Sequence, residues 1–199
     1  MLLVGLSGSL GSGKSTVGRA LEARGAAVID TDQVAREVVA PGSAGAQAVF
    51  DHFGQGVRGA DGAIDRPALA AIVFADPAPR AALEAITHPL VHREVARRVA
   101  GLGHSLVVVE IPLLTTANRD LYGFDVVVLV ETGPDVAVRR AVERGMAEDD
   151  ARARMAAQPT AAQRRQVADR TLVNDGTRAE LEIAVDELWG WLQQQSPHA

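Results

Sequence analysis

The hydrophobic residues of the chain gather in short unbroken runs, and longer segments of helical composition lie between them. Unbroken apolar runs rich in β-branched residues are typical of strands that are buried on both faces of a parallel sheet. Five segments are predicted as strands on this basis: residues 2–7, 26–29, 106–109, 126–130 and 172–173. Because these strands alternate with helical segments, the pattern predicts an α/β fold with a doubly wound parallel sheet of about five strands.

Three helical segments have the length of ordinary crossover or terminal helices. They are predicted over residues 15–24, 134–144 and 180–195. Gly25 is typical of a helix end, and Pro134 suits the first turn of a helix.

The segment between the second and third strands is too long for a simple crossover. It is mostly helical in composition, with breaks expected at Pro41-Gly42, at residues 54–62 and at Asp76-Pro77. We therefore expect a single domain over residues 1–199, in which residues 33–101 form an inserted helical subdomain. The insert is expected over the carboxyl edge of the sheet, where ligands bind in such folds.

Composition narrows the class of protein. The chain has 199 residues, a formal net charge of −5 and no cysteine, which excludes disulfides, thiolate metal sites and cysteine nucleophiles. The sequence contains neither a run of about 18 apolar residues nor the features of a signal peptide, so a cytoplasmic location is expected. The negative charge argues against nucleic acid as a partner, no membrane partner is expected, and the oligomeric state is left open.

Lysine usage is unusual. Of the 20 basic residues, 19 are arginine, and Lys14 is the one lysine. A codon bias with one chance survivor is the neutral explanation. The functional explanation is that a compact ammonium is required at this position, because arginine and lysine are not interchangeable where a phosphate is contacted.

Lys14 lies within a complete phosphate-binding motif. Residues 8–15, hereafter the phosphate loop, read Gly-Ser-Leu-Gly-Ser-Gly-Lys-Ser and match G-x-x-x-x-G-K-[ST] between a predicted strand and a predicted helix. A glycine-rich turn without function is the alternative. In such loops backbone N–H groups surround the phosphates, the lysine reaches the β- and γ-phosphates and the following hydroxyl binds Mg²⁺. The nucleotide is thus expected to contact Gly8, Gly11, Ser12, Gly13, Lys14, Ser15 and Thr16, with Ser15 as the metal ligand and Mg²⁺ as the cofactor.

The phosphate loop alone does not choose among kinase, GTPase and ATPase. A guanine-reading N-K-x-D segment needs a second lysine, which the chain lacks, so a GTPase is excluded. The length disfavours a large ATPase motor. A small kinase remains, with an acceptor site and a mobile lid that carries arginines.

Acidic residues follow two predicted strands. Asp32 lies just beyond the second strand, where a carboxylate can orient an attacking hydroxyl or accept its proton. Its position before Gln33 also suits a helix N-cap. Glu110 ends the third strand and is either an acid that holds Mg²⁺ through water or an ordinary strand-end acid.

Arginines follow the fourth strand. Arg139, Arg140 and Arg144 lie on the predicted helix there, and we interpret residues 139–166 as a lid whose arginines neutralise charge in phosphoryl transfer. The alternative is a solvated helix face. His88, followed by Pro89 as a potential helix break, has no clear role from these patterns alone.

A series of landmarks occurs in order along the chain: residues 5–8 with the phosphate loop, 28–32, 62–66 leading to Val73-Phe74, His88-Pro89, Pro112-Leu113-Leu114, Arg140 with Arg144, Gln158, Ala168-Asp169 and Asn174-Asp175-Gly176. In these landmarks, over almost its full length, the sequence resembles the dephospho-coenzyme A kinases. The resemblance implies transfer of the γ-phosphoryl of ATP to the 3′-hydroxyl of dephospho-coenzyme A, with these two molecules as partners.

The resemblance also implies roles for individual residues. It makes Asp32 the proposed base and Arg140 the lid arginine, both acting with Lys14 in catalysis. It places Arg144, Asn174 and Gly176 with the nucleotide. It implies that Asp32, Arg66, His88 and Leu113 contact the acceptor.

The sequence departs from the family pattern at two places. Thr115-Thr116 follows Pro-Leu-Leu where family members commonly carry Glu, and Ser9 occupies a phosphate-loop position that is usually Gly. Two other functions are kept as alternatives. One is another small-molecule kinase of the nucleoside monophosphate kinase group, and the other is a non-catalytic nucleotide-binding switch.

Overall fold

A computed structural model describes residues 1–195 of the chain, so residues 196–199 of the predicted domain lie outside the described residues. The chain divides into two compact units, which are treated separately below. The sheet unit contains Met1–Asp30 and the chain from Leu102 onward, and the helical unit contains Thr31–Gly101. In residues 1–195 no helix combines the length and the apolar character that a bilayer span requires.

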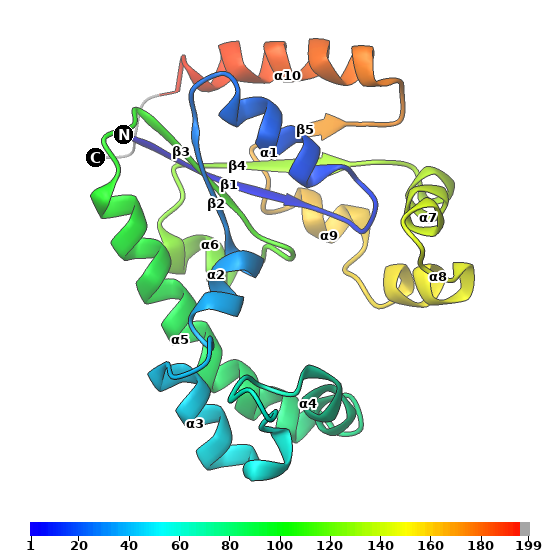
Figure 1. Ribbon diagram of the computed structural model, residues 1–199. Helices are drawn as coiled ribbons and strands as arrows, with labels where there is room; N and C mark the ends of the chain where they lie inside the picture. Colours follow the sequence, from blue (N-terminus) through cyan, green and yellow to red (C-terminus); the bar gives the residue numbers. More distant parts are fainter. Residues whose placement is uncertain (196–199) are drawn as a thin grey trace. The chain divides into compact units, whose positions relative to one another are not determined.

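The sheet unit is built on five strands, all of whose pairings are parallel (Figure 1). Their order is β2-β3-β1-β4-β5. The strands are β1 (Leu2–Gly8), β2 (Ala27–Asp30), β3 (Leu106–Glu110), β4 (Val126–Glu131) and β5 (Arg170–Val173). The predicted doubly wound parallel α/β fold is confirmed, and each predicted strand is present with its ends shifted by at most two residues.

One face of the sheet is covered by α1 (Lys14–Glu22) and α10 (Arg178–Leu192), which lie on the same side in Figure 1. Apolar side chains of both helices pack with strand residues in one core. Those side chains are fully or almost fully buried: Leu6, Val17, Leu21, Val128, Val185 and Leu188. Burial on this scale explains why β3 and β4, buried at every position, are continuous apolar runs in the sequence.

Four further helices belong to the sheet unit: α6 (Thr116–Tyr122), α7 (Pro134–Glu143), α8 (Glu148–Ala156) and α9 (Ala161–Arg165). Pro134 begins α7 as expected, but the helix ends at Glu143 and Arg144 is its C-cap. Helices α7 and α8 share a small core of Val138, Ala141 and Ala151.

The helical unit contains α2 (Thr31–Glu37), α3 (Ala44–Phe53), the 3₁₀ helix η1 (Gln55–Val57), α4 (Arg66–Val73) and α5 (Pro77–Gly101). Its own core includes Val49, Phe50, Val57 and Leu69. The three predicted breaks fall between the α-helices, and the second of them contains η1. Gly42 in the first break and Gly54 and Gly62 in the second have positive φ, which favours glycine. At the third break, Pro77 begins α5.

Two local expectations for the helical unit are wrong. Asp32 is not an N-cap, because α2 already begins at Thr31 and Asp32 lies within its first turn. Pro89 does not break the chain's longest helix, since it lies inside α5. A proline removes one intrahelical hydrogen bond, but α5 continues on both sides, and Thr87 Oγ1 donates to the carbonyl of Leu83 at 2.8 Å one turn earlier.

Candidate functional site

The phosphate loop joins the end of β1, the central strand, to the start of α1. Gly11 has φ +71° and Gly13 has φ +87°, a left-handed region that favours glycine. A Cβ atom would lie 2.4 Å from the Ala137 carbonyl at Gly11 and 2.4 Å from Asn174 Nδ2 at Gly13. These two glycines are therefore required both by their backbone conformation and by the close approach of α7 and of the segment after β5.

The departure at Ser9 is compatible with this loop. In residues 1–195 every residue with positive φ is a glycine, so Ser9 has an ordinary backbone conformation. Its carbonyl accepts a hydrogen bond from the Ser12 N–H at 3.1 Å.

Lys14 and Ser15 both contact Glu110 at the end of β3. Lys14 Nζ lies 2.9 Å from Glu110 Oε2, and Ser15 Oγ donates to the same oxygen at 3.1 Å. The side chain of Glu110 is only 5% exposed and that of Lys14 is 14% exposed. Glu110 is therefore a partner of the phosphate loop, which argues against the alternative of an ordinary strand-end acid.

Asn174, which follows β5, connects three parts of the site. Its Nδ2 donates to the Ser12 carbonyl at 2.7 Å, and its backbone N–H donates to the Glu131 carbonyl at 2.8 Å. Its own carbonyl accepts from Arg140 Nη1 at 2.9 Å. Because Asn174 is buried, these bonds hold the phosphate loop and α7 against the segment between β5 and α10.

The predicted lid arginines occupy different environments. Arg140 is half-buried and bonded to Asn174, whereas Arg139 is exposed. Arg144 Nε donates to the Arg140 carbonyl at 3.0 Å. Arg140 and Arg144 thus contact each other at the end of α7. This contact does not fit the alternative that all three arginines form one solvated helix face.

Asp175 makes contacts for which the sequence analysis assigned it no role. Its Oδ1 accepts from the Gly133 N–H at 2.6 Å and from Thr132 Oγ1 at 2.7 Å. These two hydrogen bonds, first from Gly133 and then from Thr132, lower the pKa of Asp175 below its ordinary value, with a further contribution from nearby Arg140. Asp175 thereby ties the start of α7 to the segment after β5.

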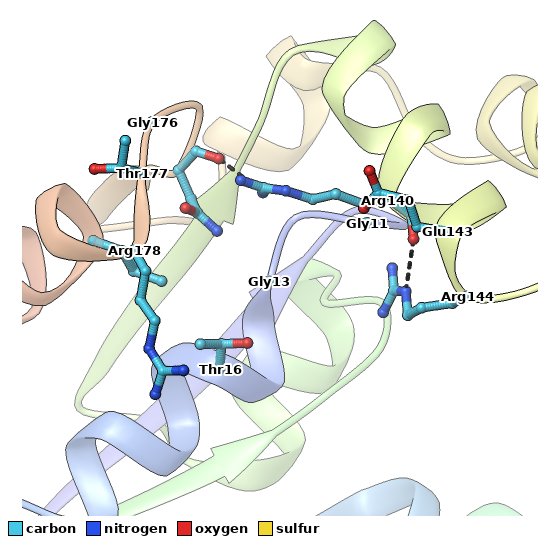
Figure 2. A pocket seen from close by; sticks show the side chains of 11 residues that line it. Gly11, Gly13, Thr16, Arg140, Glu143, Arg144, Gly176, Thr177 and Arg178 are labelled. Carbon is cyan, nitrogen blue, oxygen red and sulfur yellow. Dashed lines mark hydrogen bonds between the residues drawn. The ribbon is translucent and has the colours of Figure 1, made fainter.

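A cavity of about 310 Å³ opens between these elements. Figure 2 shows its lining, with the phosphate loop and α1 between Arg144 on one side and Arg178 on the other. The lining residues are Gly11, Gly13, Thr16, Arg140, Glu143, Arg144, Asn174, Gly176, Thr177, Arg178 and Leu181. Eight residues that the sequence analysis assigned to nucleotide binding or to the lid therefore line one cavity, and Glu143 is among them only as part of the lid segment. Thr177, Arg178 and Leu181 were missed.

A second buried acid, Glu131 at the end of β4, was also missed. Arg165 Nε donates to Glu131 Oε2 at 2.6 Å, and Arg164 Nη2 lies 3.4 Å from Oε1. The sequence did contain a signal for Glu131, because it ends an apolar strand in the same way as Glu110.

Gln158 contacts the phosphate loop. Its Oε1 accepts a hydrogen bond from the backbone N–H of Leu10 at 3.2 Å.

The residues expected to contact the acceptor are distributed over both units. Leu113 follows β3 in the sheet unit and is 43% exposed. In the helical unit, Asp32 lies in α2, Arg66 begins α4 and His88 lies in α5. At the departure from the family pattern, Thr116 begins α6, and Thr115 before it caps this helix in a capping box with Asn118.

Comparison with known proteins identifies the family. Residues 2–180 match the family described as dephospho-CoA kinase. A dephospho-CoA kinase of Frankia casuarinae is 48% identical over 190 residues, which cover 95% of this chain and 82% of that protein. One of Streptomyces avermitilis is 47% identical over 191 residues, covering 95% and 93%. The crystal structure of TT1252 from Thermus thermophilus superposes with a TM-score of 0.82 at 33% identity, covering 98% of each chain. The chain therefore belongs to the dephospho-CoA kinase family, a group of ATP-dependent phosphotransferases.

Proposed function

We propose that this protein transfers the γ-phosphoryl group of ATP to the 3′-hydroxyl of dephospho-coenzyme A, which yields coenzyme A and ADP in the last step of coenzyme A biosynthesis. Family membership supports the reaction. The observation that carries the proposal is the cavity between the phosphate loop, α7 and the start of α10. It adjoins the loop whose lysine and hydroxyl are oriented by one buried carboxylate.

In this proposal the nucleotide lies with its base in the cavity and its phosphates over the phosphate loop. Asn174 and Gly176 border the base, and the backbone N–H groups of the loop and the N-terminus of α1 bind the phosphates. A volume of about 310 Å³ suits the base and sugar of a nucleotide rather than the complete triphosphate. The buried hydroxyl of Ser12, which has no hydrogen-bond partner among residues 1–195, supports a ligand at the loop, because buried polar groups are normally paired.

Mg²⁺ with ATP is the proposed cofactor, and the residues present fit it. The Ser15 hydroxyl and the Glu110 carboxylate lie 3.1 Å apart and offer the oxygen ligands that Mg²⁺ prefers. No group of three or more His, Asp or Glu side chains among residues 1–195 forms a metal cage, in keeping with a metal held by one or two protein oxygens together with substrate phosphates. When bound, Mg²⁺ neutralises charge on the β- and γ-phosphates.

We propose that Asp32 accepts the proton of the 3′-hydroxyl as that oxygen attacks the γ-phosphorus. The new O–P bond forms as the bond from the γ-phosphorus to the β,γ-bridging oxygen breaks, and ADP leaves with that oxygen. Asp32 is two residues beyond Asp30, whose register partner across the β2–β3 pair is Glu110. Lys14 and Arg140 supply positive charge where negative charge develops.

The acceptor is proposed to bind residues of the helical insert, Asp32, Arg66 and His88, together with Leu113. The lid over residues 139–166 is proposed to close over the phosphates during transfer. The cytoplasmic location and the absence of nucleic-acid and membrane partners stay predictions from the sequence.

Steady-state ADP release tests the proposal directly. The purified chain should release ADP from Mg²⁺-ATP rapidly with dephospho-coenzyme A, and by contrast slowly with AMP, CMP, UMP or with no acceptor. Faster turnover with a nucleoside monophosphate would favour the alternative kinase group. Tight ATP binding without turnover on any acceptor would favour the nucleotide-dependent switch.

A further inference from the structure

Arg178 is a cavity residue for which neither the sequence motifs nor the proposed function gives a role. It is the first residue of α10 and is exposed. Figure 2 shows its side chain extending from the start of α10 towards Thr16 on α1. Thr16 and Arg178 also both line a second groove of about 610 Å³ between α1 and α10. The two side chains therefore form part of the wall between the cavity and this groove.

The guanidinium of Arg178 has neither an ion pair nor a hydrogen bond with the part of the chain that the structure describes. The natural helical partner would be Glu182, four residues later. That carboxylate is already engaged, since Arg24 Nη2 lies 3.0 Å from Glu182 Oε2. Arg178 is thus a free cation at the nucleotide cavity, whereas Arg140 is bonded to Asn174.

Helix stability does not explain this arginine. A cation at a helix N-terminus is disfavoured, because the exposed N–H groups there already carry partial positive charge. The start of α10 is stabilised instead by a capping box, in which Thr177 Oγ1 accepts from the Glu180 N–H and the Glu180 carboxylate accepts from the Thr177 N–H. A positive charge kept at an unfavourable position, unpaired and facing a cavity, points to an anionic ligand.

The position of Thr16 beside Arg178 indicates which phosphate of the nucleotide Arg178 would contact. If Lys14 and Ser15 bind the β- and γ-phosphates and the base occupies the cavity near Asn174 and Gly176, the intervening α-phosphate passes Thr16. We infer that Arg178 binds the α-phosphate of the nucleotide and so contributes to nucleotide affinity. This inference rests on the proposed nucleotide site and adds to it a cation that reaches the α-phosphate from α10.

Equilibrium binding of adenosine, AMP, ADP and ATP tests the inference, measured at low salt by competition against a fluorescent ATP analogue. Arg178→Gln should raise Kd for AMP, ADP and ATP by about 10-fold, as the loss of a charge-assisted hydrogen bond at a solvated site predicts. Binding of adenosine should not change, because it lacks the α-phosphate. Arg178→Lys should restore most of the affinity, and the effect of Arg178→Gln should shrink as salt screens the charge.

Arg19→Gln is the matched control. Arg19 is exposed on α1 and lines the second groove but not the nucleotide cavity, so the variant removes the same charge nearby and should bind AMP as the wild type does. An equal loss in Arg19→Gln would overturn the inference in favour of a general charge effect. Unchanged AMP binding in Arg178→Gln, or an equal loss for adenosine, would also overturn it.

The result is separable from the proposed reaction. The binding measurement contains no acceptor, so its outcome does not depend on turnover with dephospho-coenzyme A. A wild-type protein that binds AMP through Arg178 but does not phosphorylate dephospho-coenzyme A would leave this inference standing and refute the reaction.

Discussion

At the scale of single residues, Lys14 of the phosphate loop and Glu110 form an ion pair. Their side chains lie 2.9 Å apart, and the carboxylate is 5% exposed. A Cβ at Gly18 would lie 1.9 Å from Glu110 Oε1, so the glycine leaves room for this acid beside α1. The one lysine of the chain thus has a structural partner as well as a proposed phosphate contact.

Replacing Lys14 should therefore reduce stability as well as activity. Lys14→Met leaves a nearly buried carboxylate without its cation, and the free energy of unfolding should fall by about 2 kcal/mol, less than for a fully buried pair because Lys14 is partly exposed. The double variant Lys14→Met/Glu110→Gln should recover most of that loss but remain inactive. Denaturant unfolding without nucleotide measures both effects. If the single variant is as stable as the wild type, the ion pair contributes nothing to folding.

Asp32 belongs to the same scale, and its proposed role is chemical rather than structural. Asp32→Asn keeps the size of the side chain but cannot accept a proton, so kcat should fall by roughly 10²–10⁴ while Kd for ATP changes little. Asp30→Asn is a control at the adjacent strand end and should retain more activity. A folded Asp32→Asn variant with near-normal kcat would remove Asp32 from the mechanism.

At the scale of elements, α7 carries the proposed transition-state cation. Arg140→Ala should lower kcat by about 10²–10³ and raise KM for ATP by a smaller factor, because its charge is needed most as the phosphoryl group transfers. Arg139→Ala on the same helix is exposed and does not line the cavity, so it should behave as the wild type. An effect of Arg140→Ala on KM alone would assign Arg140 to ground-state binding.

Helix α5 contains a carboxylate with a lowered pKa. Hydrogen bonds from Arg97 and then Arg98 lower the pKa of Glu94 from 4.5 to about 2. A folded pKa below the unfolded one stabilises the protein above the unfolded value, and the gain is lost as pH falls towards the folded value. The difference in Tm between wild type and Glu94→Gln should be constant above about pH 5 and shrink as pH is lowered below about 4.5. A difference that stays constant down to pH 3 would show that the shifted pKa does not contribute to stability.

The sequence predicted best those helices and strands whose composition alone distinguishes them from their surroundings. Strands β3 and β4 were predicted from apolar, valine-rich runs of a length typical of strands and too short for an ordinary helix. Strand β5 begins earlier than predicted, at Arg170, because its polar start pairs with Val128 of β4, and composition does not reveal pairing. The helix that contains Asp32 begins at Thr31, which is buried, and the local pattern of residues does not reveal this burial.

The residues of the candidate site show the same contrast between local patterns and contacts made by distant parts of the chain. The phosphate loop was predicted from its own spacing, and Arg140 and Arg144 were assigned to the lid from their position after the fourth strand. Asn174 and Gly176 were placed with the nucleotide only through the resemblance. The bonds of Asp175 to Gly133 and of Glu131 to Arg165 join positions 42 and 34 residues apart. Such pairs are created by the order of β4 and β5 in the sheet, which no local pattern encodes.

At the scale of the whole molecule, each unit has its own core and its own proposed task. The nucleotide cavity is lined only by residues of the sheet unit, whereas three of the four residues proposed for the acceptor lie in the helical unit. In the proposed reaction, the sheet unit binds the nucleotide and the helical unit supplies most of the residues proposed for the acceptor.

Tracing the phosphoryl group tests the proposed reaction most directly. The protein is incubated with dephospho-coenzyme A and ATP carrying ¹⁸O in its γ-phosphoryl group, and the products are analysed by mass spectrometry and ³¹P NMR. The proposal predicts one ADP for each coenzyme A, with the label in a new phosphomonoester on the ribose 3′-oxygen, and no product from Lys14→Met. ADP formed with the label in free phosphate, or a phosphoester at another position of the acceptor, would contradict it.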